Sequence, residues 1–131
     1  MNVSNQTEVR ATAQKVYELL GDCRRLGNYL PEQVQDWKAE ENACEFSIPG
    51  VAKANAHIVE KQQFEKIYYQ IDNDKNVPMH LRLDIAGQGD ACTLSVTVEI
   101  DLPIFLAPMV KGPVQKVVDL ALEKIKTAAE Q

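Results

Sequence analysis

The sequence predicts an α+β fold, in which a curved antiparallel sheet of six to seven strands grips a long C-terminal helix, with one or two short helices after the first strand. Apolar and polar residues alternate through most of residues 33–102, which is the period of strands with one dry and one wet face. Over residues 104–129, apolar residues recur at spacings of three and four, which is the period of a helix. A chain of 131 residues is expected to form a single domain over residues 1–131.

The pattern of residues 2–31 predicts the first strand and the short helices. Residues 2–9 read as the strand. Thr12 is expected to cap a helix that ends at Gly21-Asp22, because a hydroxyl favours the start of a helix and glycine its end. A second short helix or turn follows, and Pro31 stops it.

The remaining strands are separated by residues that favour turns. These separators are Glu41-Asn42, Pro49-Gly50, Gln62-Gln63, Asn73–Asn76 and Gly87–Asp90. An antiparallel sheet of this size twists and bulges, so we expect it to curl and not to stay flat.

The C-terminal helix carries a broad apolar stripe that must face the dry side of the sheet. The stripe consists of Leu106, Val110, Val114, Val117, Ala121, Ile125 and Ala128. Pro108 falls near the helix start, where proline is tolerated. Pro113, after Gly112, removes a backbone donor and is expected to kink or restart the helix. The break is either a gate or a static bend that helps the helix follow the sheet.

Composition and charge argue against several function classes. The net charge of −5 and the lack of a basic stripe disfavour nucleic acid as a partner. The apolar runs are too short for stable membrane insertion. No secretory signal is visible and the three cysteines are scattered, so we expect a cytoplasmic protein with free thiols. Nucleotide-binding and serine hydrolase motifs are absent, and we expect no cofactor, no metal and no catalytic residue.

The order of the elements resembles the START-like, helix-grip (SRPBCC) superfamily, which includes Bet v 1-type proteins and polyketide cyclases. Residues Ala11 to Asp22 are similar to the opening helix of bacterial members, where a small residue and a cap precede a Val-aromatic-x-Leu-Leu core. The stretch Leu26 to Pro31, followed by Pro49-Gly50, looks like the coenzyme Q-binding and carbon monoxide dehydrogenase accessory branches. The resemblance covers essentially the whole chain. It implies a cavity between sheet and helix that holds a lipid, sterol, quinone or polyketide.

Nine residues form the predicted ligand-binding set. They are Trp37, Phe46, Ala54, Tyr69, Met79, Leu81, Met109, Pro113 and Val117. Three alanines, at positions 52, 54 and 56, share one predicted inner face and would leave volume opposite the helix. The alternative is that these residues fill a solid core. The Tyr69 hydroxyl needs a partner, which is Asn5 or Thr7, a ligand oxygen, or an internal hydrogen bond.

Three function hypotheses follow, and the first is binding or transport of a hydrophobic or amphipathic small molecule in the cavity. The alternative is a polyketide cyclase or dehydratase-type enzyme that uses a polar residue in the same cavity. His57 and His80 are expected to face outward, which disfavours both as its base. The third hypothesis is a partner-binding module that forms a homodimer through the outer sheet face or an edge.

Overall fold

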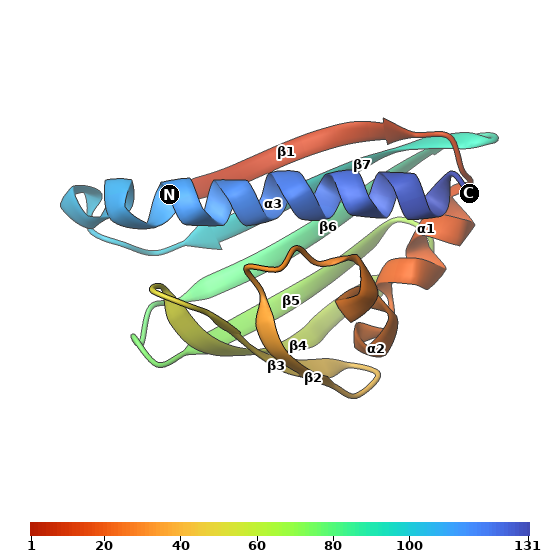
Figure 1. Ribbon diagram of the computed structural model, residues 1–131. Helices are drawn as coiled ribbons and strands as arrows, with labels where there is room; N and C mark the ends of the chain where they lie inside the picture. The colour runs from red at the N-terminus through yellow and green to blue at the C-terminus, as the bar shows by residue number, and fades with distance from the viewer.

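The computed structural model describes residues 1–131 and shows a seven-stranded antiparallel sheet curled around the C-terminal helix (Figure 1). The predicted fold class is confirmed. The strands lie in the order β1-β7-β6-β5-β4-β3-β2. In chain order the elements are β1 (Asn2–Val9), α1 (Ala13–Leu20), α2 (Cys23–Leu26), the 3₁₀ helix η1 (Gly27–Tyr29), β2 (Gln35–Ala39), β3 (Ala43–Ile48), β4 (Ala52–Gln62), β5 (Lys66–Asn73), β6 (Met79–Gln88), β7 (Ala91–Ile100), the 3₁₀ helix η2 (Ile104–Leu106) and α3 (Ala107–Ala129).

Side-chain caps fix the starts of the two short helices. The hydroxyl of Thr12 accepts a hydrogen bond from the backbone N–H of Lys15 at 3.2 Å, as its position predicts. The carboxylate of Asp22 accepts one from the backbone N–H of Arg24 at 2.9 Å and starts α2. Gly21 ends α1, also as expected. These caps place α1 and α2 beside one end of the sheet, close to the C-terminal end of α3 (Figure 1).

The register of the sheet gives its inner face an apolar surface. β1 pairs with β7, so that Val3 lies opposite Val98 and Val9 opposite Cys92. Every second residue of β7 is buried from Cys92 to Ile100, which confirms the alternation read from the sequence. Register shifts in β2 and in β4, the latter between Ile58 and Glu60, are local irregularities of the kind that bend a sheet.

The helix α3 runs without interruption from Ala107 to Ala129, with Pro108 in its first turn as predicted. Pro113 lies inside it, so of the two outcomes expected at Gly112-Pro113, a kink or a restart, the restart is wrong. The flanking turns hold the helical path, because proline at 113 removes only one hydrogen bond, to the carbonyl of Met109. None of the helices is long and apolar enough to cross a membrane.

The buried face of α3 is rotated slightly from the predicted stripe. Its fully buried residues are Val114, Val118, Leu122, Ile125 and Ala129. Val117 and Ala121, from the predicted stripe, are only half-buried. The cause is the position of the helix, which packs mainly against β1 and also touches α1. This packing directs Val117 and Ala121 toward the open middle of the sheet.

Candidate functional site

A cavity of about 170 Å³ lies between α3 and the concave face of the sheet. Of the 25 residues that line it, 24 are hydrophobic. Residues of β2 to β7 form the sheet side, and α3 contributes Val110, Val114, Val117, Val118, Ala121 and Ile125. The alternative of a solid core is therefore wrong for the space beside Val117 and Ala121. A dry apolar space of this size costs stability unless it is filled.

The structure brings seven of the nine predicted residues together in the wall of this cavity. They are Trp37, Phe46, Ala54, Tyr69, Met79, Leu81 and Val117. For the six of these residues that lie on β2 to β6, the alternation of apolar and polar residues along the strands was enough to predict that they face inward.

Met109 and Pro113 do not line the cavity, which corrects the predicted set. Met109 is 74% exposed, because it lies on the opposite face of α3 from the buried Val118 and near the end that projects beyond the strands (Figure 1). Pro113 is exposed and lines a neighbouring groove. The helix is slightly rotated from the predicted stripe, and this rotation turns Pro113 away from the sheet.

Sequence reasoning missed a second group of wall residues that precede the second strand. Leu26 comes from α2, and Leu30 and Val34 from the segment after η1. Leu26 and Leu30 are four residues apart, which favours a helical turn, but Leu30 and Val34 lie in an irregular segment, so this spacing gave no sign that they face the cavity. Val96 and Val98 of β7 were also missed, although their inward positions were readable from the alternation.

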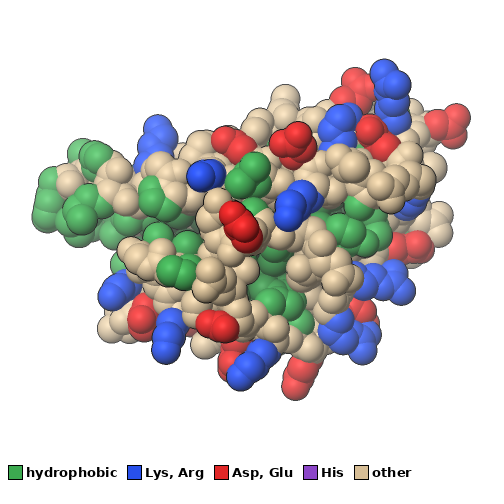
Figure 2. All heavy atoms as spheres, in the orientation of Figure 1, with side chains coloured by type: hydrophobic (Ala, Val, Ile, Leu, Met, Phe, Trp, Pro, Cys, Tyr) green, Lys and Arg blue, Asp and Glu red, His purple; other side chains and the backbone are tan.

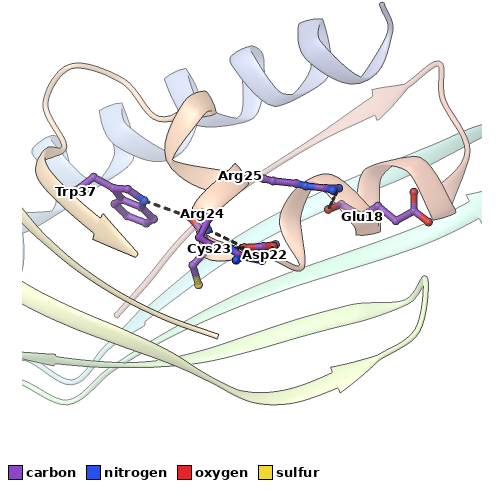
Figure 3. Close-up of polar contacts among 6 residues, drawn as sticks. All are labelled: Glu18, Asp22, Cys23, Arg24, Arg25 and Trp37. Carbon is purple, nitrogen blue, oxygen red and sulfur yellow. Dashed lines mark hydrogen bonds and ion pairs between the residues drawn. The ribbon is translucent and has the colours of Figure 1, made fainter. Parts of the chain in front are cut away.

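Trp37 is held against α2 and forms one end of the wall (Figure 3). Its indole Nε1 donates a hydrogen bond to the carbonyl oxygen of Cys23 at 3.2 Å. Its ring stacks on Phe46, with 5.6 Å between centroids. Both aromatic side chains therefore present apolar edges to the cavity, while the one polar atom of the indole is satisfied by the backbone.

The segment that carries Cys23 is fixed by charge at the surface (Figure 3). The carboxylate of Asp22 forms an ion pair with Arg24 at 2.7 Å. The hydrogen bond from the Arg24 side chain lowers the pKa of Asp22 to about 2. Arg25 reaches the carbonyl oxygen of Glu18 at 3.5 Å, so basic side chains bind both ends of the α1–α2 connection.

Tyr69 is the most buried polar group of the wall, with 1% of its surface exposed. Its hydroxyl donates to the carbonyl oxygen of Leu20 at 3.1 Å and lies 3.9 Å from the sulfur of Cys23. Burial raises the pKa of Tyr69, and the neighbouring Cys23 raises it further, so the phenol is neutral. Of the alternatives predicted for the Tyr69 hydroxyl from the sequence, the structure shows the internal hydrogen bond.

Asn5 and Thr7 are not partners of Tyr69. Asn5 is exposed and donates to the carboxylate of Asp119 at 2.9 Å, because β1 runs beside the outer flank of α3. The hydroxyl of Thr7 lies 3.4 Å from the carbonyl oxygen of Glu8 on its own strand. The two side chains are therefore not available to orient a guest molecule in the cavity.

The wall carries no Asp, Glu, His, Lys or Arg. The one lining residue outside the hydrophobic class is Asn73, whose amide nitrogen donates to the carbonyl oxygen of Val77 at 2.7 Å. The amide oxygen of Asn73 accepts from the backbone N–H groups of Lys75 and Val77. His57 and His80 are exposed, as predicted. No cluster of three or more His, Cys, Asp or Glu residues is placed to hold a metal ion.

A more polar groove borders the cavity below the β3–β4 turn. The two share Ile48, Val51 and Val117, so these residues form the mouth between them. Glu32, Gln33, Gln35, Gly112, Pro113 and Lys116 line the rest of the groove together with the Pro49-Gly50 turn. The side-chain oxygen of Gln33 is buried and accepts no hydrogen bond from another protein group. An apolar chamber therefore meets a mouth with charged and hydrogen-bonding side chains.

Comparison with known proteins gives one family over nearly the whole chain. The model of the polyketide cyclase / dehydrase and lipid transport family matches residues 1–130. No curated protein matches the sequence at a significant level.

Solved structures share the fold at low sequence identity. A Chromobacterium violaceum protein is 17% identical over 99% of this chain and 98% of its own, with a TM-score of 0.77. A START superfamily protein from Mycobacterium smegmatis is 17% identical over 99% and 97%, also with a TM-score of 0.77. The Aha1 dimer from Colwellia psychrerythraea is 12% identical over 99% and 96%, with a TM-score of 0.70. At these identities the likeness establishes the fold alone.

Proposed function

Because the chain belongs to the polyketide cyclase / dehydrase and lipid transport family, we propose that it is a single domain that binds a hydrophobic or amphipathic small molecule between the sheet and α3. The observation that carries the proposal is the cavity of about 170 Å³ with 24 hydrophobic residues among its 25. Each CH₂ group that a guest transfers from water to such a wall contributes about 0.8 kcal/mol. Trp37, Phe46, Ala54, Tyr69, Met79, Leu81 and Val117 are the proposed contact residues.

The volume limits what the cavity holds without rearrangement. An apolar cavity of ~150 Å³ in another protein admits benzene. A single aromatic ring or a short aliphatic segment therefore fits here. A longer lipid, quinone or polyketide would extend past Ile48 and Val51 into the groove. There its polar end would meet the side chains of Gln33 and Lys116.

The family description also includes cyclases and dehydrases, but the cavity wall favours binding over acid–base catalysis. General acid–base chemistry needs a titratable group within hydrogen-bond reach of the substrate. The titratable groups in the wall are Cys44 and Tyr69. Hydrogen bonding with Cys23 and burial raise the pKa of Cys44, and burial raises that of Tyr69. Both groups are therefore neutral, and the Tyr69 hydroxyl is already engaged with Leu20.

A cytoplasmic location remains a prediction that the cysteines support. Cys23, Cys44 and Cys92 are all free and buried. Unpaired thiols are typical of reducing compartments. A homodimer also remains a prediction, and light scattering of the purified protein tests it.

Native mass spectrometry tests the binding proposal. The protein is incubated separately with palmitic acid, a short-chain ubiquinone and the aromatic polyketide emodin, and glycerol is the polar control. We expect a one-to-one complex with at least one apolar compound and none with glycerol. A protein that stays empty with all three apolar compounds at their solubility limits would contradict the proposal.

A further inference from the structure

The projecting end of α3 carries an unusual exposed apolar cluster. Of the four large hydrophobic residues that are exposed in this protein, three lie within six positions: Ile104 at 90%, Phe105 at 78% and Met109 at 74%. They belong to η2 and the first turn of α3, which extend beyond the ends of the strands (Figure 1). Figure 2 shows hydrophobic side chains gathered at this end of the molecule. Exposed apolar groups that cluster in this way mark interaction sites, whereas scattered ones do not.

The chain segment that carries this cluster has a charge opposite in sign to that of the whole chain. Residues 102–118 contain Lys111 and Lys116 and no Asp or Glu, although the net charge of the protein is −5. Both lysines are exposed, and neither takes part in any of the four ion pairs of the structure. The nearest acidic residues along the chain, Asp101 and Asp119, flank the segment. The segment itself is thus cationic as well as apolar, and Glu32 is the one acidic residue in the groove that Lys116 lines.

The cluster is continuous with the mouth of the cavity. Phe105, Met109, Pro113 and Lys116 are spaced by three or four residues, so they follow one face of the helix. Pro113 and Lys116 line the groove that borders the cavity. Lys116 lies about 10 Å from Met109 along the helix axis, at 1.5 Å per residue. A surface that covers Phe105 and Met109 therefore lies next to the groove.

We propose that this projecting end, formed by Ile104, Phe105, Met109, Lys111 and Lys116, docks reversibly on anionic lipid bilayers. The apolar side chains would enter the interface between headgroups and acyl chains, and the two ammonium groups would pair with lipid phosphates. The contact is too small for permanent anchoring, and the net charge of −5 opposes non-specific binding of the protein to an anionic surface. Docking in this orientation brings the groove beside the lipid surface.

A second copy of the chain is the less favoured occupant. A stable dimer needs roughly 800 Å² from each partner, far more than three projecting side chains supply. Two such ends in contact would also bring the unpaired Lys111 and Lys116 of each copy together. Anionic lipid, in contrast, complements both the apolar and the cationic character of the surface.

Vesicle flotation with the full chain tests the proposal. The probes are vesicles of phosphatidylcholine alone and of phosphatidylcholine mixed with phosphatidylglycerol, each at low and high salt. The wild type should float with the mixed vesicles at low salt and be released by high salt, because the lysine contribution is screened. The triple variant with Ile104→Ser, Phe105→Ser and Met109→Ser should bind the mixed vesicles with an affinity lower by more than about tenfold. Val59→Ser, at a residue that is 53% exposed on β4, is the apolar control and should behave as wild type.

A second pair of variants separates the lysines from net charge. Lys111→Glu with Lys116→Glu should abolish flotation with the mixed vesicles. Lys38→Glu with Lys61→Glu, at exposed positions of β2 and β4, makes the same change in net charge and should weaken binding far less. Equal loss in both charge variants would overturn the assignment of the cationic surface.

Three further results would overturn the docking proposal. One is a wild type that floats with neither kind of vesicle, and another is a serine variant that floats as well as the wild type. The third is a wild-type dimer in light scattering that the serine variant converts to monomer, which would assign the surface to a second copy. Binding of the small apolar probes without vesicles should be unchanged in the serine variant, so a failure of docking is distinguishable from a failure of ligand binding.

Discussion

Gly27 lies so close to Trp37 that a Cβ atom at position 27 would be 2.4 Å from Nε1 of the indole and 2.5 Å from Cδ1. The absent side chain lets the indole reach the carbonyl oxygen of Cys23 and form part of the cavity wall. The contact therefore links η1, which begins at Gly27, to the cavity. It also explains why the segment needs glycine here for space, since its φ of −57° is open to any residue.

The variant Gly27→Ala should displace Trp37. We expect a loss of about 1–3 kcal/mol in the free energy of unfolding, the usual cost of overpacking a well-packed site. Tryptophan fluorescence should shift to the red, because the only tryptophan becomes more exposed to water. The control is Gly112→Ala, where a Cβ meets nothing within 4 Å. Alanine is the better helix former, so this control should gain up to about 1 kcal/mol. An unchanged emission maximum and stability in Gly27→Ala would contradict the contact.

The variant Tyr69→Phe tests the internal hydrogen bond at neutral pH. Loss of the hydroxyl leaves the carbonyl oxygen of Leu20 without this donor in a buried place. We expect the free energy of unfolding to fall by about 1–3 kcal/mol, measured by chemical denaturation. A variant as stable as the wild type would show that the hydrogen bond contributes nothing net.

The same variant tests the raised pKa of Tyr69 at alkaline pH. Burial, and next the charge of Cys23, raise this pKa above the ordinary value of 10.0. The phenol therefore stays neutral in the folded protein at a pH where it ionises in the unfolded chain. The contribution of Tyr69 to the free energy of unfolding is fully present below pH 10. It is lost as the pH rises above 10, by at most about 1.4 kcal/mol per pH unit. Denaturation curves up to about pH 11 should fall less steeply for Tyr69→Phe than for the wild type. Equal slopes would contradict the assignment.

Ala54→Leu should fill part of the cavity. The larger side chain removes space for a guest, and a displaced contact of two CH₂ groups costs about 1.6 kcal/mol, roughly tenfold in affinity. The measurement is a fluorescence titration with the apolar probe N-phenylnaphthylamine. Ala86→Leu makes the same change on the outer face of β6 and should leave the affinity unchanged. Equal affinity in both variants would place the probe outside the cavity.

Much of the fold was readable from the sequence because local signals agree with the tertiary structure. Thr12 and Gly21 cap the first helix, and the alternation along β7 marks its buried face. The same alternation placed Ala54, Tyr69 and Leu81 in the wall of the cavity. Such patterns are reliable when all the apolar residues of a helix or strand face the same surface.

The remaining features depend on packing that has no period in the sequence. The rotation of α3 follows from its contact with β1, and it decides that Val117 lines the cavity while Pro113 does not. The close approach of Trp37 to Gly27 joins segments that lack a shared pattern. Periodicity likewise gave no sign that Met109 lies beyond the edge of the sheet, because the helix continues past the surface that covers it.

Crystallography of the protein exposed to benzene tests the binding proposal most directly, because the cavity of about 170 Å³ admits a guest of this size without rearrangement. We predict electron density for benzene between α3 and the sheet, in contact with Leu81 and Val117. Benzene bound only on the outer surface at saturating concentration, with side chains closed over the space between Leu81 and Val117, would contradict it.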